Sequence, residues 1–576
     1  MFVSFLKKYG WLYVVGIVIL VIHSRIKTLI PSELGNAIDL LNDRAPRSDI
    51  YHCALLIVLL AVLVFITQFF WRICIIGNSR RLDIELRKDY FAKLQSLPVS
   101  FFSKQRSGDL IAYAINDISA VRMMFGPVFA MSINGIVTAT LSIFSMTGDI
   151  DPHMTLFALL PVPVAILALV VLGQMVQKRS RKAQDLFSKI SGFVNESIMG
   201  IKVVKSFAKE ENWTADYKEI SDEMKQANIR LNNAGSLIGP AVSVTFAVSF
   251  TISLIYGGNL VLNGEMSVGD LVAFQSYLTL VQTPVIQLGR IINMVQRGIA
   301  SYKRLNVIFK EPSIDTKEFA DYNQPIKGDI SCRHLNFCYP GSEKPALCDV
   351  SFDLHAGQTL GIAGTTGSGK TTLCSLLLKF YHTPRGMLFI DGVDINDIPA
   401  KAVREAVGYV AQDGFLFSSS VEDNIRFYAD MLNGRTQKAA ALSNIDTEIQ
   451  QFEQKYETRV GERGTRLSGG QKQRISLARA LYKDPQILIL DDTLSAVDNI
   501  TETVITGHLD GVLKNKTAIV ISHRLSALQH SDLILYMQDG KVIEAGTHEQ
   551  LMRKNGMYAN TYRMQQERQD DHVEEE

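Results

Sequence analysis

Long apolar stretches alternate with polar segments along the first half of the chain. Crossing the roughly 30 Å hydrocarbon core of a bilayer as a helix takes about 20 mostly apolar residues. Stretches of about this length run from Trp11 to Ile30, Cys53 to Gly77, Pro127 to Thr147, Met154 to Met175, Leu237 to Leu262 and Val268 to Leu288. We therefore expect residues 1–321 to form an all-α membrane domain with six spans, an even number that returns the chain to its starting side.

The connections between these stretches differ in length and charge. Gly148 to His153 and Asn263 to Ser267 are short, acidic and free of Lys and Arg, whereas residues 78–126 and 176–236 are long and rich in basic side chains. Basic connections tend to stay on the cytoplasmic side of a membrane. The pattern predicts a multi-pass protein of the cytoplasmic (inner) membrane, with both termini in the cytoplasm.

Both long connections keep apolar residues at helical spacing, as at Leu82 and Leu86. We therefore expect the helices to continue beyond the membrane before the chain turns back. Gly108 with Asp109, and the segment Lys209 to Trp213, are the predicted turning points. Ordinary polar helix ends would show the same spacing.

A few polar side chains interrupt the apolar stretches. Gln68 and Arg72 lie in the second stretch, and Gln275, Gln282 and Gln287 lie in the sixth. Polar groups in hydrocarbon are costly and usually face the bundle interior or a wet cavity, so these side chains could border a substrate pathway. Arg72 could instead extend its charged head to the membrane surface. Spans with so few charges suit a small hydrophobic or amphipathic compound, including a cationic one.

The composition is consistent with a chain that has two different parts, one in the membrane and one in water. The 576 residues are 47% hydrophobic and 20% charged, which is too apolar for a soluble enzyme and too charged for a chain that lies wholly in the membrane. A formal net charge of +1 gives no basic surface for nucleic acid. The six cysteines have no CxxC spacing, which indicates reduced structural thiols.

From about Tyr322 short apolar runs alternate with helical segments, which is typical of an α/β domain. Within residues 322–576, the segment Gly364-Thr365-Thr366-Gly367-Ser368-Gly369-Lys370-Thr371 fits the pattern G-x-x-x-x-G-K-[ST]. It follows the apolar run Thr359 to Ala363 and leads through Thr372 into the helical run Leu373 to Phe380. Backbone N–H groups of such a loop close on phosphate, and the helix N-terminus favours its charge. Lys370 would reach the outer phosphates, and Thr371 would ligate Mg²⁺.

Two carboxylates follow a second buried strand. The apolar run Ile487 to Leu490 ends in Asp491 and Asp492. A carboxylate at the end of a buried strand is costly unless a cation offsets its charge, and Mg²⁺ bound to phosphates would do so. Solvated carboxylates at a strand end are the alternative.

Between these motifs stands Leu467-Ser-Gly-Gly-Gln471, and with it the second half resembles the ATP-binding cassette (ABC) family. The six spans ahead of the cassette resemble the exporter class of that family. The resemblance implies that Ser468, Gly469, Gly470 and Gln471 contact a nucleotide held by a second cassette.

Further residues take roles that the resemblance implies. Tyr339 would stack on adenine, Gln412 would join Mg²⁺ to the membrane interface, and His523 would lie near the γ-phosphate. Asp491 would share the metal with Thr371 and Gln412. The segments that resemble contacts between cassettes or with cytoplasmic loops are Ser495 to Asp498, Thr458 to Glu462, Ser107 to Leu110 with Asn116 and Asp117, and Gly200 to Phe207.

One position departs from the family pattern. The family usually has Glu directly after the metal-binding Asp, where it orients and deprotonates the attacking water, and this chain has Asp492. The shorter side chain withdraws the carboxylate by more than about 1 Å, which can cost roughly a hundredfold in rate. Because Ser468, Gly469 and Gly470 are intact, the chain resembles the degenerate-site subunit of heterodimeric bacterial multidrug exporters of the LmrCD and BmrCD type. A homodimer that uses Asp492 as a slower base is the alternative.

The resemblance also leaves the cargo open. ATP-driven export of amphipathic or hydrophobic compounds by alternating access is the leading expectation. A lipid or peptide translocator on the same scaffold, or a mainly regulatory ATP-binding subunit, is the alternative.

Overall fold

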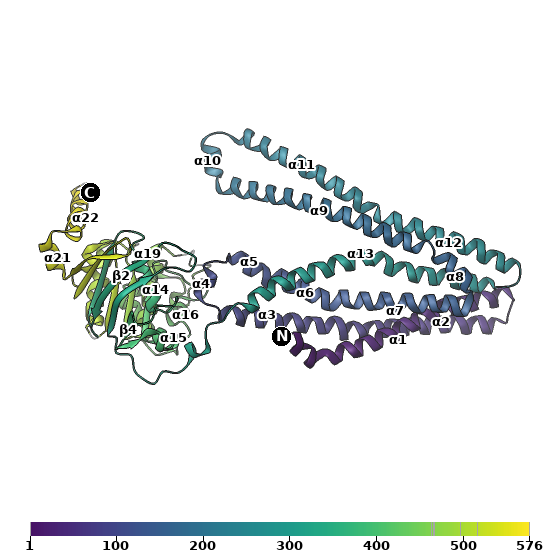
Figure 1. Ribbon diagram of the computed structural model, residues 1–576, viewed down its shortest axis with the longest axis horizontal. Helices are drawn as coiled ribbons and strands as arrows, with labels where there is room; N and C mark the ends of the chain where they lie inside the picture. The colour runs from purple at the N-terminus through teal and green to yellow at the C-terminus, as the bar shows by residue number, and fades with distance from the viewer. Residues whose placement is uncertain (1, 462–463, 465–466, 496, 515, 575–576) are drawn as a thin grey trace. The chain divides into compact units, whose positions relative to one another are not determined.

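The chain folds into two compact units. The computed structural model describes residues 2–461, 464, 467–495, 497–514 and 516–574. One unit comprises residues 1–95 and 107–311, and the other comprises residues 96–106 and 312–576 (Figure 1). The first unit is helical and the second is α/β, so the predicted fold class is confirmed.

The first unit consists of long helices (Figure 1). Their bounds, with π-helical turns marked η, are α1 Phe2–Asn42, α2 Arg47–Arg72, η1 Ile73–Gly77, α3 Asn78–Gln95, α5 Ser107–Ala112, η2 Tyr113–Asp117, α6 Ile118–Met123, η3 Met124–Val128, α7 Phe129–Ser145, η4 Met146–Ile150, α8 Pro152–Leu159, α9 Val162–Met199, α10 Ile201–Ser206, α11 Glu210–Ser236, α12 Ile238–Leu262 and α13 Val268–Lys310. Many continue far past the apolar stretches, as the helical spacing in the long connections predicted.

Five helical stretches of the described chain are long and apolar enough to cross a membrane. They cover residues 7–42, 47–95, 107–150, 152–199 and 210–262. The sixth predicted span, Val268 to Leu288, lies in α13, which does not reach the same apolarity over its length. The polar residues Gln275, Gln282 and Gln287 in this segment account for part of the difference.

The two predicted turning points have different outcomes. Gly108 and Asp109 lie in α5, so the first prediction was wrong. The chain turns instead around the short helix α4 (Val99–Phe102), because Pro98 interrupts the helical path after α3. The second turn includes α10 and ends at Lys209, the first residue of the predicted segment, whereas Glu210 to Trp213 already lie in α11.

A charge cluster joins two helical segments of the first unit, with Asp117 and Ser301 buried and Arg304 exposed. Asp117 Oδ1 accepts a hydrogen bond from Ser301 Oγ at 2.8 Å, and Arg304 donates to both carboxylate oxygens at 2.8 and 2.6 Å. Such a bidentate pair fixes orientation as well as distance. It holds η2 against α13.

The second unit contains two sheets (Figure 1). The larger sheet has the order β10-β9-β3-β8-β7-β6, and the smaller has the order β2-β1-β4-β5. The strands are β1 Ile330–Phe337, β2 Leu347–Leu354, β3 Thr359–Gly364, β4 Leu388–Ile390, β5 Val393–Asp394, β6 Val407–Val410, β7 Ile487–Asp491, β8 Thr517–Ile521, β9 Leu533–Gln538 and β10 Lys541–Gly546. In the larger sheet β9, β3, β8, β7 and β6 pair in parallel, and β10 pairs antiparallel at the edge.

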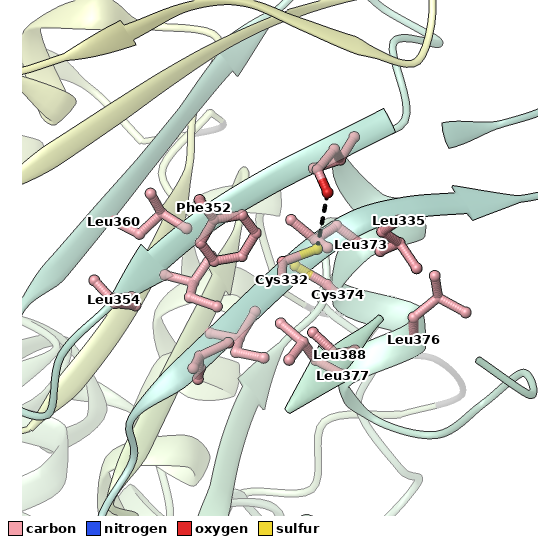
Figure 2. Close-up of a cluster of buried hydrophobic side chains, with 14 of the residues drawn as sticks. Cys332, Leu335, Phe352, Leu354, Leu360, Leu373, Cys374, Leu376, Leu377 and Leu388 are labelled. Atoms are coloured by element: carbon pink, nitrogen blue, oxygen red, sulfur yellow. Dashed lines mark hydrogen bonds between the residues drawn. The ribbon is translucent and has the colours of Figure 1, made fainter. Parts of the chain in front are cut away.

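Apolar side chains from both sheets and from α14 (Lys370–Leu377) form the main core of this unit (Figure 2). Cys332 and Cys374 lie inside it, and Cys332 Sγ donates to the Val350 carbonyl at 3.3 Å. Burial raises the pKa of the Cys332 thiol to about 12, so this thiol stays protonated and unreactive. All six cysteines are free.

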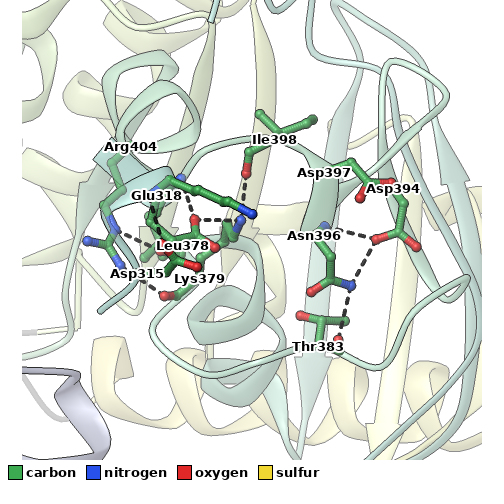
Figure 3. Close-up of polar contacts among 12 residues, drawn as sticks. Asp315, Glu318, Leu378, Lys379, Thr383, Asp394, Asn396, Asp397, Ile398 and Arg404 are labelled. Atoms are coloured by element: carbon green, nitrogen blue, oxygen red, sulfur yellow. Dashed lines mark hydrogen bonds and ion pairs between the residues drawn. The ribbon is translucent and has the colours of Figure 1, made fainter. Parts of the chain in front are cut away.

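Polar contacts attach the segment after α13 to the second unit (Figure 3). Glu318 pairs with Lys379 at 2.8 Å and accepts a hydrogen bond from the backbone N–H of Ala400 at 2.8 Å. Arg404 donates to the carbonyls of Leu378 and Lys379 at 3.0 and 2.9 Å. Residues 312–321 thus pack with the second unit, and the expected domain limit after Asp321 stays a prediction.

Candidate active site

Four neighbouring parallel strands deliver the candidate residues to one edge of the larger sheet. In the order β3-β8-β7-β6, the carboxyl ends of these strands lead to the Lys370 loop, His523, Asp491 with Asp492, and Gln412. The carboxyl ends of parallel strands lie at the same edge of a sheet, which is where open α/β sheets bind ligands. Residues far apart in the chain therefore meet there.

The loop from Gly364 to Thr372 has a backbone that only glycine adopts easily at three points. Gly364, Gly367 and Gly369 have φ of +142°, +80° and +99°. A Cβ on Gly369 would lie 2.6 Å from the Ala346 carbonyl oxygen, so a side chain has no room there. Gly369 is the N-cap of α14, and the first N–H groups of that helix are free to bind an anion.

The Lys370 ammonium lies over its own loop. Nζ donates to the carbonyls of Gly364 and Thr365 at 2.9 and 2.8 Å. Burial lowers the pKa of Lys370, and the charges of Asp492 and Asp491 oppose this shift. A phosphate would relieve the burial cost by giving the ammonium a directly bound counter-charge.

The Ser368 hydroxyl is also buried in this loop. Within the part of the chain that the structure describes, it has no hydrogen-bond partner. Buried polar groups are normally satisfied, so an oxygen-rich ligand in the loop would supply what this hydroxyl lacks.

Asp491 and Thr371 face each other at the mouth of the loop. Thr371 Oγ1 donates to Asp491 Oδ1 at 3.3 Å, and Tyr409 OH donates to Asp491 Oδ2 at 3.5 Å. Burial raises the pKa of Asp491, as does the charge of Asp492, while the Thr371 and Tyr409 hydrogen bonds and Lys370 lower it. A hydroxyl and a buried carboxylate beside a phosphate loop fit Mg²⁺, which prefers oxygen ligands and usually binds one or two carboxylates together with phosphate.

Asp492 lies between Gln412 and His523. Its Oδ2 accepts from Gln412 Nε2 at 3.5 Å, and its Oδ1 accepts from the backbone N–H of His523 at 3.4 Å. Both contacts are long, so the carboxylate is not tightly held. The residue is buried and has φ of +48°, a left-handed conformation that Asp tolerates better than most residues. The structure thus brings together Gln412, Asp492 and His523.

Tyr339 lies beside the helix that follows the loop. Its hydroxyl is 2.9 Å from Thr372 Oγ1, and its ring makes edge contacts with Phe337 and Tyr381 at centroid distances of 5.2 and 5.0 Å. These contacts orient the ring near the nucleotide loop. Stacking on adenine stays a prediction.

The Leu467-Ser-Gly-Gly-Gln471 segment begins α19 (Gly469–Lys483). Ser468 and Gln471 form a capping box: Gln471 N donates to Ser468 Oγ at 3.2 Å, and Ser468 N donates to Gln471 Oε1 at 3.0 Å. Gly469 and Gly470 form the first turn between them. The Gln471 side chain is therefore used inside its own chain, and a nucleotide contact by this segment would come from Ser468 and the backbone.

Sequence reasoning missed Glu448, which holds the start of α19. Its carboxylate accepts from Gln471 Nε2 at 2.9 Å and from Arg474 Nη1 at 2.6 Å. Arg474 also donates to the Asn444 carbonyl at 2.7 Å. Glu448 stands in an ordinary polar segment, so only the fold shows this contact.

Glu448→Ala is expected to lower ATPase activity by about tenfold while leaving nucleotide binding at the Lys370 loop unchanged. Losing hydrogen bonds to a charged partner costs about 1–3 kcal/mol, and about 1.4 kcal/mol in a transition state is a factor of ten in rate. Steady-state ATPase and filter binding of labelled ATP would be measured. Glu453→Ala, which removes an exposed acid nearby, is the control, and normal ATPase in Glu448→Ala would contradict the positioning role.

Two family models match the chain. "ABC transporter transmembrane region" covers residues 13–285, and "ABC transporter" covers residues 347–495. The chain belongs to the ABC transporter family. The chain therefore has both the membrane domain and the ABC domain of an exporter, and the ABC domain implies ATP binding and ATPase activity.

Relatives match this ABC exporter over nearly its whole length. "Probable multidrug resistance ABC transporter ATP-binding/permease protein YheI" of Bacillus subtilis (strain 168) is 37% identical over 98% of this chain and 98% of its own length. "Multidrug resistance-like ATP-binding protein MdlA" of Escherichia coli (strain K12) is 32% identical over 96% and 94%. A solved structure, "Structure of a bacterial Atm1-family ABC exporter with ATP bound", superposes with a TM-score of 0.78 at 26% identity, covering 97% of this chain and 98% of that one.

Two expected segments are only partly described. Glu462, at the end of the Thr458 segment, and Ala496, inside the Ser495 to Asp498 segment, lie outside the described residues. The rest of both segments is present, and Asp498 caps α20 (Asn499–Leu513) by accepting from the backbone N–H of Thr501 at 2.9 Å.

Proposed function

We propose that this ABC exporter moves hydrophobic or amphipathic compounds out across the cytoplasmic membrane by alternating access, with its termini and cassette in the cytoplasm. The observation that carries this is the gathering of the Lys370 loop, Asp491, Asp492, Gln412 and His523 at one sheet edge, in a chain that also has long apolar helices. A nucleotide site coupled to membrane helices suits a pump. The names of the relatives support drugs or similar compounds as cargo.

In the proposed cycle, backbone N–H groups of the loop and Lys370 bind the ATP phosphates. Thr371, Asp491 and Gln412 would hold Mg²⁺, which would neutralise phosphate charge there. Asp492 would accept the proton of the attacking water, and His523 would contact the γ-phosphate. Ser468, Gly469 and Gly470 would close on the nucleotide of a second cassette, so two chains are needed for each complete site.

We further propose that the second chain is a different one. The Asp492 carboxylate has only long contacts to its neighbours, at 3.4 and 3.5 Å, and lacks one methylene relative to Glu, so this chain's own site would hydrolyse slowly. Its Ser468 cap is formed and could complete a competent site on a partner. In a heterodimer that competent site could supply the hydrolysis, whereas a homodimer would have the slow site twice.

Transport by the purified pair is the test. The chain, isolated with whatever second transporter chain co-purifies, would be reconstituted in vesicles, and we expect ATP-dependent movement of an amphipathic fluorescent dye. Lys370→Ala is the matched control, because it leaves the membrane unit unchanged and should stop the movement. ATP hydrolysis without movement of any dye would contradict export of such compounds and favour a lipid or peptide translocator. ATP binding without hydrolysis or movement would favour a regulatory subunit.

A further inference from the structure

The second unit contains a cavity of about 490 Å³ that the candidate active site does not use. Its walls come from α17 (Arg435–Leu442), the junction of α19 and β7, the end of α20 and the residue before β8. Because β7 and β8 are parallel, their amino ends lie at the sheet edge opposite the candidate active site. Small-molecule sites usually have volumes of about 300–1,000 Å³, so this cavity has room for a small organic compound.

The charged side chains that line this cavity are mostly cationic. Arg435, Lys438 and Lys516 stand against a single carboxylate, that of Asp484, so positive charge is in excess by two. Arg435 and Lys438 are three residues apart on α17 and therefore lie on the same face of that helix. Lys516 Nζ donates to the Pro485 carbonyl at 2.7 Å and forms an ion pair with Asp484. The cations thus come from two walls of one cavity.

The three cations act on the same carboxylate. The hydrogen bond from Lys516 lowers the pKa of Asp484, and burial opposes this shift. The charges of Lys516, Arg435 and Lys438 all lower that pKa further, so each lies within electrostatic range of one point in the cavity. Among the described residues, neither Arg435 nor Lys438 forms an ion pair with a carboxylate, and the Arg435 guanidinium lies over the Tyr482 ring at 5.2 Å from its centroid. Two positive charges therefore remain for an external anion.

The rest of the cavity wall is largely apolar. Leu481 and Leu488 are buried, and Leu442 and Val512 are half-buried against the same core. A mostly apolar wall with a few charged groups is typical of a small-molecule site. An inorganic ion would use the cations and gain nothing from this wall. The cavity therefore suits a compound that has both an anionic group and an apolar body.

Four elements connect this cavity with candidate site residues. The helix α19 runs from its Ser468 cap to the cavity, and β7 runs from the cavity to Asp491. The strand β8 starts at the cavity and leads to His523, and α20 runs from its Asp498 cap back to the cavity. A ligand bound here would therefore contact the far ends of the elements that position the candidate active site.

We propose that this cavity is a regulatory site for small organic dianions, compounds that carry a group such as a phosphate monoester on an aromatic or other apolar body. The anionic group lies among Arg435, Lys438 and Lys516, and the apolar body lies against Leu488 and its apolar neighbours. The bound compound ties α17 to α20 and to the start of β7. It thereby restrains the elements that position the active site and lowers ATPase activity. The site is distinct from the Lys370 loop, which lies at the other end of the parallel strands.

Binding would be measured by isothermal titration calorimetry on the chain with its co-purified mate in nanodiscs, with empty nanodiscs as the blank. The Lys370→Ala background is used, because it weakens phosphate binding at the nucleotide loop. The probes are 1-naphthyl phosphate, 1-naphthol and inorganic phosphate, which separate the anionic group from the apolar body. We expect 1-naphthyl phosphate to bind at least about tenfold more tightly than either of the other two.

Variants of the cavity should change this affinity in opposite directions. Arg435→Gln/Lys438→Gln should weaken the binding of 1-naphthyl phosphate by about tenfold. Asp484→Asn should strengthen it by about threefold, because it releases Lys516 and leaves one more positive charge in excess. Lys514→Gln is the matched control, since it removes an exposed cation at the end of α20 that does not line the cavity, and it should change nothing. Partial unfolding would weaken binding in every variant and could not produce the gain.

Steady-state ATPase of the pair with Lys370 intact tests the regulatory role. We expect 1-naphthyl phosphate to lower it by about fivefold, and Arg435→Gln/Lys438→Gln to abolish this inhibition. Inhibition that persists in the double variant would show competition at the nucleotide loop and would overturn the proposal. Binding without any change in ATPase would also overturn it. Equal binding of 1-naphthyl phosphate and either 1-naphthol or inorganic phosphate to the intact cavity would overturn it even if the variants fail to fold.

Discussion

Asp491→Asn is expected to raise the melting temperature of the nucleotide-free protein and to remove most of the stabilisation that MgATP provides. Burial raises the pKa of Asp491, so the folded state disfavours its charged form. That unfavourable contribution is present above the folded-state pKa and disappears as the pH falls through it. Asparagine removes the charge and keeps an oxygen acceptor for Thr371, so the empty cassette should become more stable.

The response to MgATP should change in the opposite direction. A ligand at a hundredfold excess over its Kd stabilises the folded state by about 2.7 kcal/mol, and this gain falls as the Kd rises. Because Asp491 and Thr371 would hold the metal, we expect the variant to show little of the gain. Thermal unfolding would be followed by differential scanning calorimetry, with and without MgATP, on the intact complex.

Asp484→Asn is the matched control for this experiment. The hydrogen bond from Lys516 lowers the pKa of Asp484, so the folded state favours the charged form above the unfolded pKa. Neutralising Asp484 should therefore lower the melting temperature of the nucleotide-free protein and leave the MgATP gain intact. A full MgATP gain in Asp491→Asn would contradict the metal-binding role.

The conformation of the candidate phosphate-binding loop could be predicted from the sequence because its parts are local. The loop from Gly364 to Thr371 carries its own glycines, lysine and helix start, so its conformation depends mainly on local sequence. Gln412, Asp492 and His523 each follow the end of a strand, but the sequence placed Gln412 and His523 in the site only through the resemblance to the family. Parallel pairing of β3, β8, β7 and β6 then put them together.

Contacts that depend on tertiary packing could not be predicted. Glu448 gives no sequence signal, yet it holds Gln471 and Arg474. The first turning point was placed at Gly108 because glycine suggests a break, whereas Pro98 and α4 make the turn. The contacts of α1 with α2 and α13 could not be predicted either, because the apolar stretch from Trp11 to Ile30 gives no register against its neighbours.

Asp492→Glu tests the proposed asymmetry of the two sites and should produce a large gain of activity. The added methylene extends the carboxylate by more than about 1 Å toward the position of the attacking water, a displacement that can be worth roughly a hundredfold in rate. The change should cost little stability, although Glu tolerates the φ of +48° less well than Asp. Asp492→Asn is the control, because it keeps the size and removes the base, and it should abolish any residual hydrolysis at this site.

Measuring Asp492→Glu both in the pair and in this chain expressed alone distinguishes a heterodimer from a homodimer. In a pair whose second chain has its own catalytic carboxylate changed to an amide, the site built on Lys370 of this chain is the remaining source of hydrolysis. We expect almost no ATPase there with Asp492 and a gain of roughly a hundredfold with Glu. A comparable gain in this chain expressed alone would show that two copies assemble into a working pair and would contradict the heterodimer. No gain in either background would mean that the length of the side chain at this position does not limit hydrolysis, since the loop, the metal ligands and the Ser468 cap are all unchanged by the substitution.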